Sequence, residues 1–485
     1  MTLVLDHRPA LSAEARPLPS SQQEPATPAR SLLRFITCGS VDDGKSSLIG
    51  RLLFEAGAIP DDQLSSLAAD SQRHGTTGGG LDFALLVDGL QAEREQGITI
   101  DVAYRYFATE ARSFIVADTP GHEQYTRNMA TGASTADAAI ILIDARKGVL
   151  PQTCRHSAIV SLVGVRHVLV AINKIDLIGY DRAAITAIAD AYRSAVATLG
   201  FHSVTVIPVS ARDGDNIKTA SRHTPWHQGP TLIEWLESVS PPTALDREGG
   251  AVLPVQWVNR PSLDFRGFAG TVAAGRLHPG DAVVALPAGT HARVERLVTF
   301  DGDLAVATAG QAVTVTLDRE IDISRGDVLI DAAGATHLTV ARQARVRLLV
   351  TADRRIAVGD RFSVRLGTTS ASAQIAAIQS ATDMAGLAER PVDALGLNDV
   401  GTVDLAFDRP LALTPYAQQR ALGALILIDR MTDATAAMGI VMSAPARDAI
   451  GRSDRRWWQR WTTSEVTLLR LSGWALSAGL VGAGA

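Results

Sequence analysis

Residues 39–46 read Gly-Ser-Val-Asp-Asp-Gly-Lys-Ser and fit the pattern G-x-x-x-x-G-K-[ST] without a gap. A short apolar run from Leu32 to Thr37 precedes them, and Ser47 to Phe54 follows with helical spacing. A glycine-rich turn between a strand and a helix lets successive backbone N–H groups converge at the positive end of that helix. The pattern therefore predicts a cradle for phosphate groups in an α/β fold.

Two side chains of this loop have specific predicted tasks. Lys45 is expected to reach the β and γ phosphates of a nucleoside triphosphate, and the Ser46 hydroxyl to hold Mg²⁺. We expect the nucleotide to be bound by nine consecutive residues, namely Gly39, Ser40, Val41, Asp42, Asp43, Gly44, Lys45, Ser46 and Ser47.

Apolar runs alternate with amphipathic stretches from Leu32 to about Leu245. Buried strands alternating with helices predict a doubly wound, mostly parallel sheet, whose ligands lie beyond the carboxyl ends of the strands. The segment from about Ser71 to Gly80 is expected to be a loop without an assigned role. Strands are predicted at 33–38, 102–107, 113–118, 138–144, 167–172 and 204–209, and helices include 181–199 and 231–239.

A polar motif, Asn173-Lys174-Ile175-Asp176, follows the strand that ends at Ile172. A carboxylate at Asp176 can accept from both N1–H and the exocyclic amine of guanine, a donor pair that adenine lacks, so Asp176 is predicted to select GTP over ATP. Asn173 is expected to support the loop and the base edge, and the Lys174 stem to cover the ring. Ser210 and Ala211 follow the next strand at the spacing of a guanine site.

A second loop, Asp118-Thr119-Pro120-Gly121-His122, ends the strand before it. Asp118 is expected to bind Mg²⁺ through water, and the Gly121 N–H to meet the γ phosphate. His122 stands where it could orient the attacking water, although a structural histidine is the alternative. In Gly97-Ile98-Thr99-Ile100, Thr99 is the candidate that closes over Mg²⁺ and the γ phosphate. Both loops would be ordered by the γ phosphate, which makes the domain a switch.

The pattern of apolar runs and turn residues changes after Ser240-Pro241-Pro242-Thr243. From Val252 to about Val441 the chain consists of short Val-rich stretches broken by Gly, Pro and Asp-Gly, which predicts two small β-barrels. The predicted organisation is a disordered lead at 1–30, a nucleotide-binding domain at 31–245, barrels at 250–340 and 341–442, and an extension of unknown role at 443–485.

Composition narrows the class of protein. The chain has 485 residues and a net charge of −5, so no strong nucleic-acid field is indicated. It has two cysteines, Cys38 and Cys154, in neither metal nor redox spacing. No apolar run reaches the ~20 residues of a membrane span, and no secretory signal begins the chain. These features predict a cytoplasmic protein.

The motifs together resemble the translational-factor class of GTPases typified by elongation factor Tu. Three longer strings, 86–107, 121–134 and 258–267, closely resemble the GTP-binding subunit of heterodimeric sulfate adenylyltransferase (ATP sulfurylase). Asp43 stands where translation factors usually carry His. The resemblance runs from about Leu32 to about Val441.

This resemblance implies a smaller partner subunit that joins sulfate to the AMP part of ATP, giving adenosine 5′-phosphosulfate and pyrophosphate, while this chain hydrolyses GTP. It assigns Ser46, Thr99 and Asp118 to Mg²⁺, Lys45 to the phosphates, and Asn173, Lys174, Asp176, Ser210 and Ala211 to guanine. Many relatives continue into an adenylylsulfate kinase domain; with a single P-loop here, that activity is not expected.

Two other readings stay open at this point. The chain could be a translation factor whose barrels bind RNA, or a regulatory GTPase without a sulfurylase partner. The terminal segment, with Arg455-Arg456-Trp457-Trp458 and an uncharged run from Leu471, could contact a membrane or partner, but an extension without function is the simpler expectation.

Overall fold

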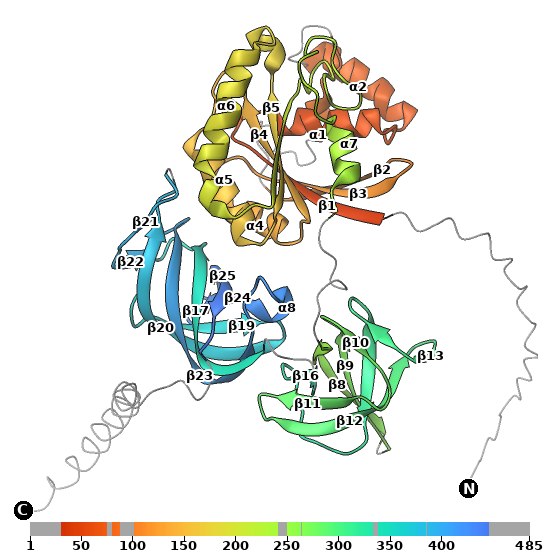
Figure 1. Cartoon of the computed structure of the whole chain (residues 1–485), viewed down its shortest axis with the longest axis vertical. Coiled ribbons are helices and arrows are strands. Elements are labelled where there is room, and N and C mark those ends of the chain that lie inside the picture. The colour runs from red at the N-terminus through yellow and green to blue at the C-terminus, as the bar shows by residue number, and fades with distance from the viewer. Residues whose placement is uncertain are drawn as a thin grey trace, which may run out of the picture.

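The computed structural model describes residues 31–74, 80–87, 101–240, 250–262, 264–332, 338–384 and 386–445. These ranges form an α/β domain (31–240), a first barrel (250–332) and a second barrel (338–445) (Figure 1). The predicted fold class is thereby confirmed. The lead at 1–30, Thr99 and residues 446–485 of the extension lie outside the described residues.

The α/β domain is built on a six-stranded sheet with the order β2-β3-β1-β4-β5-β6. Only β2 runs antiparallel to its neighbour, so the sheet is mixed but mostly parallel. All six predicted strands are found, each displaced by at most about two residues. The strands are β1 (Ser31–Cys38), β2 (Ala103–Ala108), β3 (Arg112–Asp118), β4 (Ala138–Asp144), β5 (His167–Asn173) and β6 (Ser203–Pro208).

Two helices of this domain, α6 and α7, begin at side-chain caps. The Asp181 carboxylate accepts from the Ala183 N–H over 2.8 Å at the start of α6, and Thr231 forms a capping box with Glu234 on α7. Helix α2 continues to His74, so the loop predicted from about Ser71 was wrong for residues 71–74. The helices are α1 (Lys45–Glu55), α2 (Asp61–His74), α4 (Thr126–Ser134), α5 (Pro151–Leu162), α6 (Arg182–Ala195) and α7 (Leu232–Ser238), with 3₁₀ turns η1 (Phe83–Leu86), η2 (Glu123–Tyr125), η3 (Ile175–Ile178) and η4 (Ala197–Leu199).

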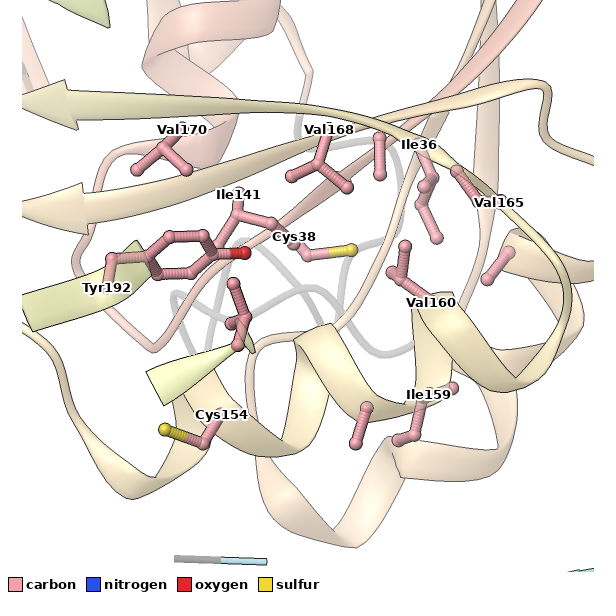
Figure 2. Close-up of a cluster of buried hydrophobic side chains, with 14 of the residues drawn as sticks. Ile36, Cys38, Ile141, Cys154, Ile159, Val160, Val165, Val168, Val170 and Tyr192 are labelled. Carbon is pink, nitrogen blue, oxygen red and sulfur yellow. The ribbon is translucent and has the colours of Figure 1, made fainter. Parts of the chain in front are cut away.

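Helices cover both faces of the sheet. Residues of α1 and α7 pack with Phe35 and Phe114 on one face, whereas α4, α5 and α6 pack on the other. Figure 2 shows this second face, where Cys38, Cys154 and Tyr192 lie among Ile and Val side chains. Every residue of β4 is buried, as expected for a central strand of a doubly wound sheet. Among the described helices, none is long and apolar enough to cross a membrane.

The first barrel follows the strand order β7-β16-β11-β12-β15-β9-β8, with β13 beside β12 and a separate β10–β14 pair. Its core is a cluster of aliphatic side chains around Phe268. The strands are β7 (Val252–Pro254), β8 (Trp257–Ser262), β9 (Phe265–Thr271), β10 (Arg276–Leu277), β11 (Ala282–Leu286), β12 (Thr290–Thr299), β13 (Gly302–Asp303), β14 (Ala307–Thr308), β15 (Ala312–Leu317) and β16 (Val328–Asp331).

The second barrel is closed. Its order is β19-β24-β25-β17-β23-β20-β21, and an additional ladder between β19 and β20 closes the first six of these strands into a ring, with the short β21 paired outside it to β20. Its elements are β17 (Thr339–Val350), β18 (Ile356–Ala357), β19 (Arg361–Leu366), β20 (Thr369–Thr382), β21 (Glu389–Arg390), β22 (Ala394–Leu395), β23 (Val400–Leu413), α8 (Arg420–Gly423), β24 (Ala424–Asp429) and β25 (Thr435–Ser443).

The second barrel packs against the α/β domain. Leu349, Leu387 and Val400 belong to the same buried cluster as α4 and α5. The Tyr416 hydroxyl donates to the Val163 carbonyl over 2.7 Å, and Arg420 donates to the Gly164 carbonyl over 2.8 Å. The end of α5 is therefore held by both apolar and polar contacts to this barrel.

Candidate nucleotide site

The phosphate loop lies between the end of β1 and the start of α1. Gly44 adopts φ 93° as the residue before the helix, and Asp42 adopts φ 67°. A Cβ atom at Gly44 would stand 2.5 Å from Nδ2 of Asn173. Both the dihedral angle and the space therefore require glycine at this position, which brings the loop close to the Asn173 motif.

Lys45 is buried, and its side chain folds back onto the phosphate loop. Its Nζ donates to the Gly39 carbonyl over 2.9 Å and to the Ser40 carbonyl over 3.0 Å. Burial lowers the pKa of Lys45, while the nearby carboxylates of Asp118 and Asp43 act in the opposite direction. An ammonium group in this place can turn from two carbonyls to phosphate oxygens, which are stronger acceptors.

Two buried oxygens of the loop have no hydrogen-bond partner among the described residues. They are the Ser40 hydroxyl and Oδ1 of Asp43, whose Oδ2 accepts from the Ser40 N–H over 2.6 Å. Buried polar atoms without partners are rare in native proteins and point to a missing ligand or water. The Ser40 hydroxyl can donate to a phosphate oxygen, whereas the Asp43 carboxylate can only accept, so Ser40 is the one of the two that fits a phosphate-bearing nucleotide.

The candidate Mg²⁺ residues lie on neighbouring elements. Asp118 is buried at the end of β3 next to Thr37, whose hydroxyl lies 3.5 Å from Oδ1 of Asp118. Ser46 is in the first turn of α1. The Thr119 hydroxyl donates to the Thr37 carbonyl over 2.7 Å and so fixes the start of the 118–122 loop. The third candidate, Thr99, falls outside the described residues.

The 118–122 loop touches the phosphate loop at Gly121. A Cβ atom there would stand 2.4 Å from Nζ of Lys45 and 2.7 Å from the Gly39 carbonyl oxygen, so only glycine fits. The following residue, His122, is exposed, and its Nδ1 accepts from the Gln124 N–H over 3.2 Å. His122 caps η2 in this structure, and its catalytic role stays a prediction.

Asn173 connects the two nucleotide loops. Its Nδ2 donates to the Asp43 carbonyl over 2.9 Å, and its Oδ1 accepts from the Ala211 N–H over 3.0 Å. The side chain is buried, so it supports both loops instead of facing a base. Ser210, also buried, holds the same turn through Asp213, whose carboxylate accepts from the Ser210 hydroxyl over 3.1 Å.

Lys174 and Asp176 are the two residues predicted to contact the guanine base. Lys174 has φ 64°, and its ammonium donates to the Asp42 carbonyl and lies 3.1 Å from Asp144. Asp176 lies in η3, is partly exposed, and its carboxylate has no hydrogen-bond partner within the described ranges. An available carboxylate is what recognition of a guanine donor pair requires.

Asp144 belongs to the site but was not predicted. It is buried at the end of β4, forms ion pairs with Arg146 at 2.6 Å and with Lys174 at 3.1 Å, and so holds the Lys174 stem in place. Burial raises the pKa of Asp144, but hydrogen bonds from Arg146 and Lys174 outweigh burial and lower it overall. Like Asp118, Asp144 ends a buried strand, and this position in the sequence could have indicated that it belongs to the site.

A polar cluster on α5 was also missed. Gln152 donates to the Gly121 carbonyl over 3.3 Å and lies 2.9 Å from Nε2 of the buried His156. Arg155 donates to Oε1 of Gln152 over 2.7 Å and pairs with Glu123 at 2.9 Å. These side chains look like ordinary helix residues in the sequence, and only the fold brings them to the 118–122 loop.

The cluster reaches the second barrel. Nδ2 of Asn398 donates to the Glu123 carbonyl over 3.2 Å, and Asn398 sits in a turn with φ 65° before β23. The loop that carries Gly121 is therefore bonded on one side to α5 and on the other to the barrel.

Comparisons with known proteins agree with this geometry. Residues 30–242 match the family model of the elongation factor Tu GTP binding domain, and residues 342–442 match the GTP-eEF1A C-terminal domain-like model. The first match contains the phosphate loop and the Asn173 motif. The chain thus carries a GTP-binding domain.

The similarity to curated relatives extends over most of the chain. Sulfate adenylyltransferase subunit 1 of Citrobacter koseri is 53% identical over 413 residues, which are 85% of this chain and 86% of the relative. The chain belongs to the family of sulfate adenylyltransferase subunit 1. The resemblance stated from the sequence strings is confirmed, and with it membership of an enzyme family that contains an elongation factor Tu-like GTPase domain.

Two further matches are more partial. The bifunctional enzyme NodQ of Rhizobium sp. is 53% identical over 86% of this chain, but the match spans 64% of NodQ. The S. cerevisiae Ski7 GTPase-like domain, solved bound to GTP, aligns over 85% of this chain with a TM-score of 0.47 and 17% identity. That structure is too distant to carry a conclusion about function.

Proposed function

We propose that this chain is the GTPase subunit of a heterodimeric sulfate adenylyltransferase in the cytoplasm. A small catalytic partner subunit joins sulfate to the AMP part of ATP and releases pyrophosphate, the first step of sulfate assimilation. This chain hydrolyses GTP to GDP and phosphate. The two reactions are coupled because adenosine 5′-phosphosulfate contains a high-energy phosphoric–sulfuric anhydride, whose formation needs a second downhill reaction.

The observation that carries the proposal is the position of Asn173, which is bonded both to the phosphate loop at Asp43 and to the 210–211 turn at Ala211. One buried side chain thus fixes the phosphate cradle and the loops predicted for guanine relative to each other. Together with membership of the sulfate adenylyltransferase subunit 1 family, this supports GTP as the nucleotide.

The chain's own residues supply positioning and charge. Lys45 would hold the β and γ phosphates, the Gly121 N–H would face the γ phosphate, and His122 would turn from Gln124 to orient the attacking water. Ser46, Thr99 and Asp118 would hold Mg²⁺, which bridges the phosphates and neutralises developing negative charge. Lys174 and Asp176 would bind guanine.

Coupling to the partner would use the second barrel. Loss of the γ phosphate frees the 118–122 loop, which is bonded to α5 through Gln152 and to the barrel through Asn398. A change in this loop is therefore passed to a surface outside the α/β domain, where a partner subunit can respond.

The test is the GTP hydrolysis rate of the purified chain, alone and with the small subunit, with and without ATP and sulfate. We expect a sharp rise only when the partner and both substrates are present. A Lys45→Ala chain, which can still present its barrels to the partner, is the control and should show no rise. Hydrolysis that is indifferent to partner and sulfate would rule out the coupled function.

A further inference from the structure

Three arginine side chains meet at the junction of the two barrels. Arg325 precedes β16 in the first barrel, whereas Arg365 lies on β19 and Arg409 on β23 of the second. They line a hollow of about 370 Å³ whose other walls are Gly367, Thr368 and Ser370. The lining is thus strongly basic and polar, in a chain whose net charge is −5.

These guanidinium groups are not neutralised by ion pairs. Within the described residues, no carboxylate lies within 4.0 Å of any of the three, whereas Arg296, Arg345 and Arg354 elsewhere in the barrels all have such partners. Arg409 donates to the Ser370 carbonyl over 2.6 Å, which uses one of its donors. The Asp327 carboxylate accepts from the Ser324 N–H over 2.8 Å, and the charge of Arg409 acts to lower the pKa of Asp327, although burial raises that pKa overall. Asp327 therefore offsets part of the Arg409 charge without forming an ion pair within 4.0 Å.

The backbone around the hollow is fixed across the junction. The Thr368 hydroxyl donates to the Val255 carbonyl over 2.9 Å, and the Thr369 hydroxyl donates to the Gly326 carbonyl. Gly326 has φ 97°, and a Cβ atom there would stand 2.9 Å from Cα of Thr369. The turn that carries Arg325 is therefore fixed beside the turn between β19 and β20, which brings the backbone positions of the three exposed arginines to one place.

We propose that this hollow binds a multiply charged oxyanion of the sulfate or phosphate class, bridging the two barrels. A guanidinium group presents paired donors that match the oxygens of such anions, and three such groups, none of them in an ion pair within 4.0 Å among the described residues, create a local positive potential. The anion is either free in solution or the phosphate chain of a nucleotide. This site is separate from the GTP site and does not depend on the proposed coupling.

The test is calorimetric titration of the full chain saturated with a non-hydrolysable GTP analogue and Mg²⁺, so that the phosphate loop, including the place of the γ phosphate, is already filled. Sodium sulfate, sodium phosphate and ATP are titrated separately at constant ionic strength set with chloride, because screening weakens exposed charge pairs. Calorimetry is preferred to thermal shifts, since sulfate stabilises folded proteins in general. We expect one saturable site. If the ligand is a free anion, sulfate or phosphate will bind there; if the ligand is a nucleotide, only ATP will bind.

Variants show where the anion binds. Arg365→Ala and Arg409→Ala should each weaken binding by about tenfold, and Arg365→Lys, which keeps the charge but loses the paired donors, by less. Arg355→Ala, at an exposed arginine of the same barrel outside the hollow, should change nothing. Absence of saturable binding by all three titrants, or equal affinity in the wild-type chain and the folded Arg365→Ala/Arg409→Ala chain, overturns the proposal.

Discussion

The side-chain amide of Gln152 donates to the carbonyl oxygen of Gly121 over 3.3 Å. The N–H of the same residue, Gly121, is predicted to meet the γ phosphate. Gly121 also packs against Lys45 and Gly39. A residue on α5 thus helps to orient the part of the loop that is predicted to distinguish GTP from GDP. His156 and Arg155 in turn hold the Gln152 amide.

Gln152→Ala should lower the affinity for a non-hydrolysable GTP analogue while leaving that for GDP unchanged, because only the triphosphate needs Gly121 in place. We expect a loss of about three- to tenfold, the value of one hydrogen bond. Gln152→Glu, which has a similar length but cannot donate, should behave alike. Equal losses for GDP and the analogue would show that Gln152 merely stabilises the domain.

Asn173→Ala should destabilise the α/β domain and weaken binding of GTP and GDP together. It leaves the Asp43 carbonyl and the Ala211 N–H unpaired in a buried place, which costs about 3 kcal/mol in the free energy of unfolding. Chemical denaturation and nucleotide titration measure the two effects. Unchanged stability would contradict the bridging role of Asn173.

Asp176→Asn should change base selection with little effect on stability, since Asp176 is partly exposed and its carboxylate has no bonded partner within the described ranges. An amide cannot accept from both guanine donors, but it can donate to the 2-oxo group of xanthine. Affinity for GTP should fall about 100-fold and that for xanthosine triphosphate should rise. Competition between the two nucleotides for binding measures this change in base selection. If the variant still prefers GTP, a residue other than Asp176 contacts guanine.

His156 gives the stability a specific pH dependence. Burial, together with the nearby positive charges of Lys45 and Arg155, lowers the pKa of His156 to about 3. The unfolded chain takes up a proton below about pH 6.5, whereas the folded chain stays neutral, so stability falls as the pH drops from about 6.5 toward 3.

Between pH 7 and pH 5.5, wild-type chain should therefore lose about 1.3 kcal/mol more unfolding free energy than His156→Gln. Denaturation curves of both proteins at the two pH values provide the comparison. Parallel losses would mean that His156 is protonated in the folded chain.

The sequence predicted those parts of the site that are contiguous. The glycines at 39 and 44 and the lysine at 45 carry their chemistry in one loop, and the alternation of apolar runs placed all six strands of the α/β domain. Family-level strings such as 86–107 then identified the relatives that the comparisons found.

The parts that were missed depend on tertiary contacts. Gln152 and Asn398 are unremarkable polar residues until the fold sets α5 and the second barrel against the 118–122 loop. Residues 71–74 were predicted to belong to a loop, yet they form the end of α2, where Ser71 is buried and accepts from the Asp82 N–H over 2.9 Å. Local propensity does not reveal such bonds.

We propose above all that GTP hydrolysis by this chain drives formation of adenosine 5′-phosphosulfate. The most direct measurement is the final yield of that product from ATP and sulfate by the reconstituted two-subunit enzyme, with GTP hydrolysis followed in the same samples. With wild-type chain, the yield should exceed the equilibrium reached without GTP and rise in proportion to the GTP consumed. With Lys45→Ala, it should stop at that equilibrium. A yield independent of GTP would show that GTP hydrolysis does not drive formation of the product.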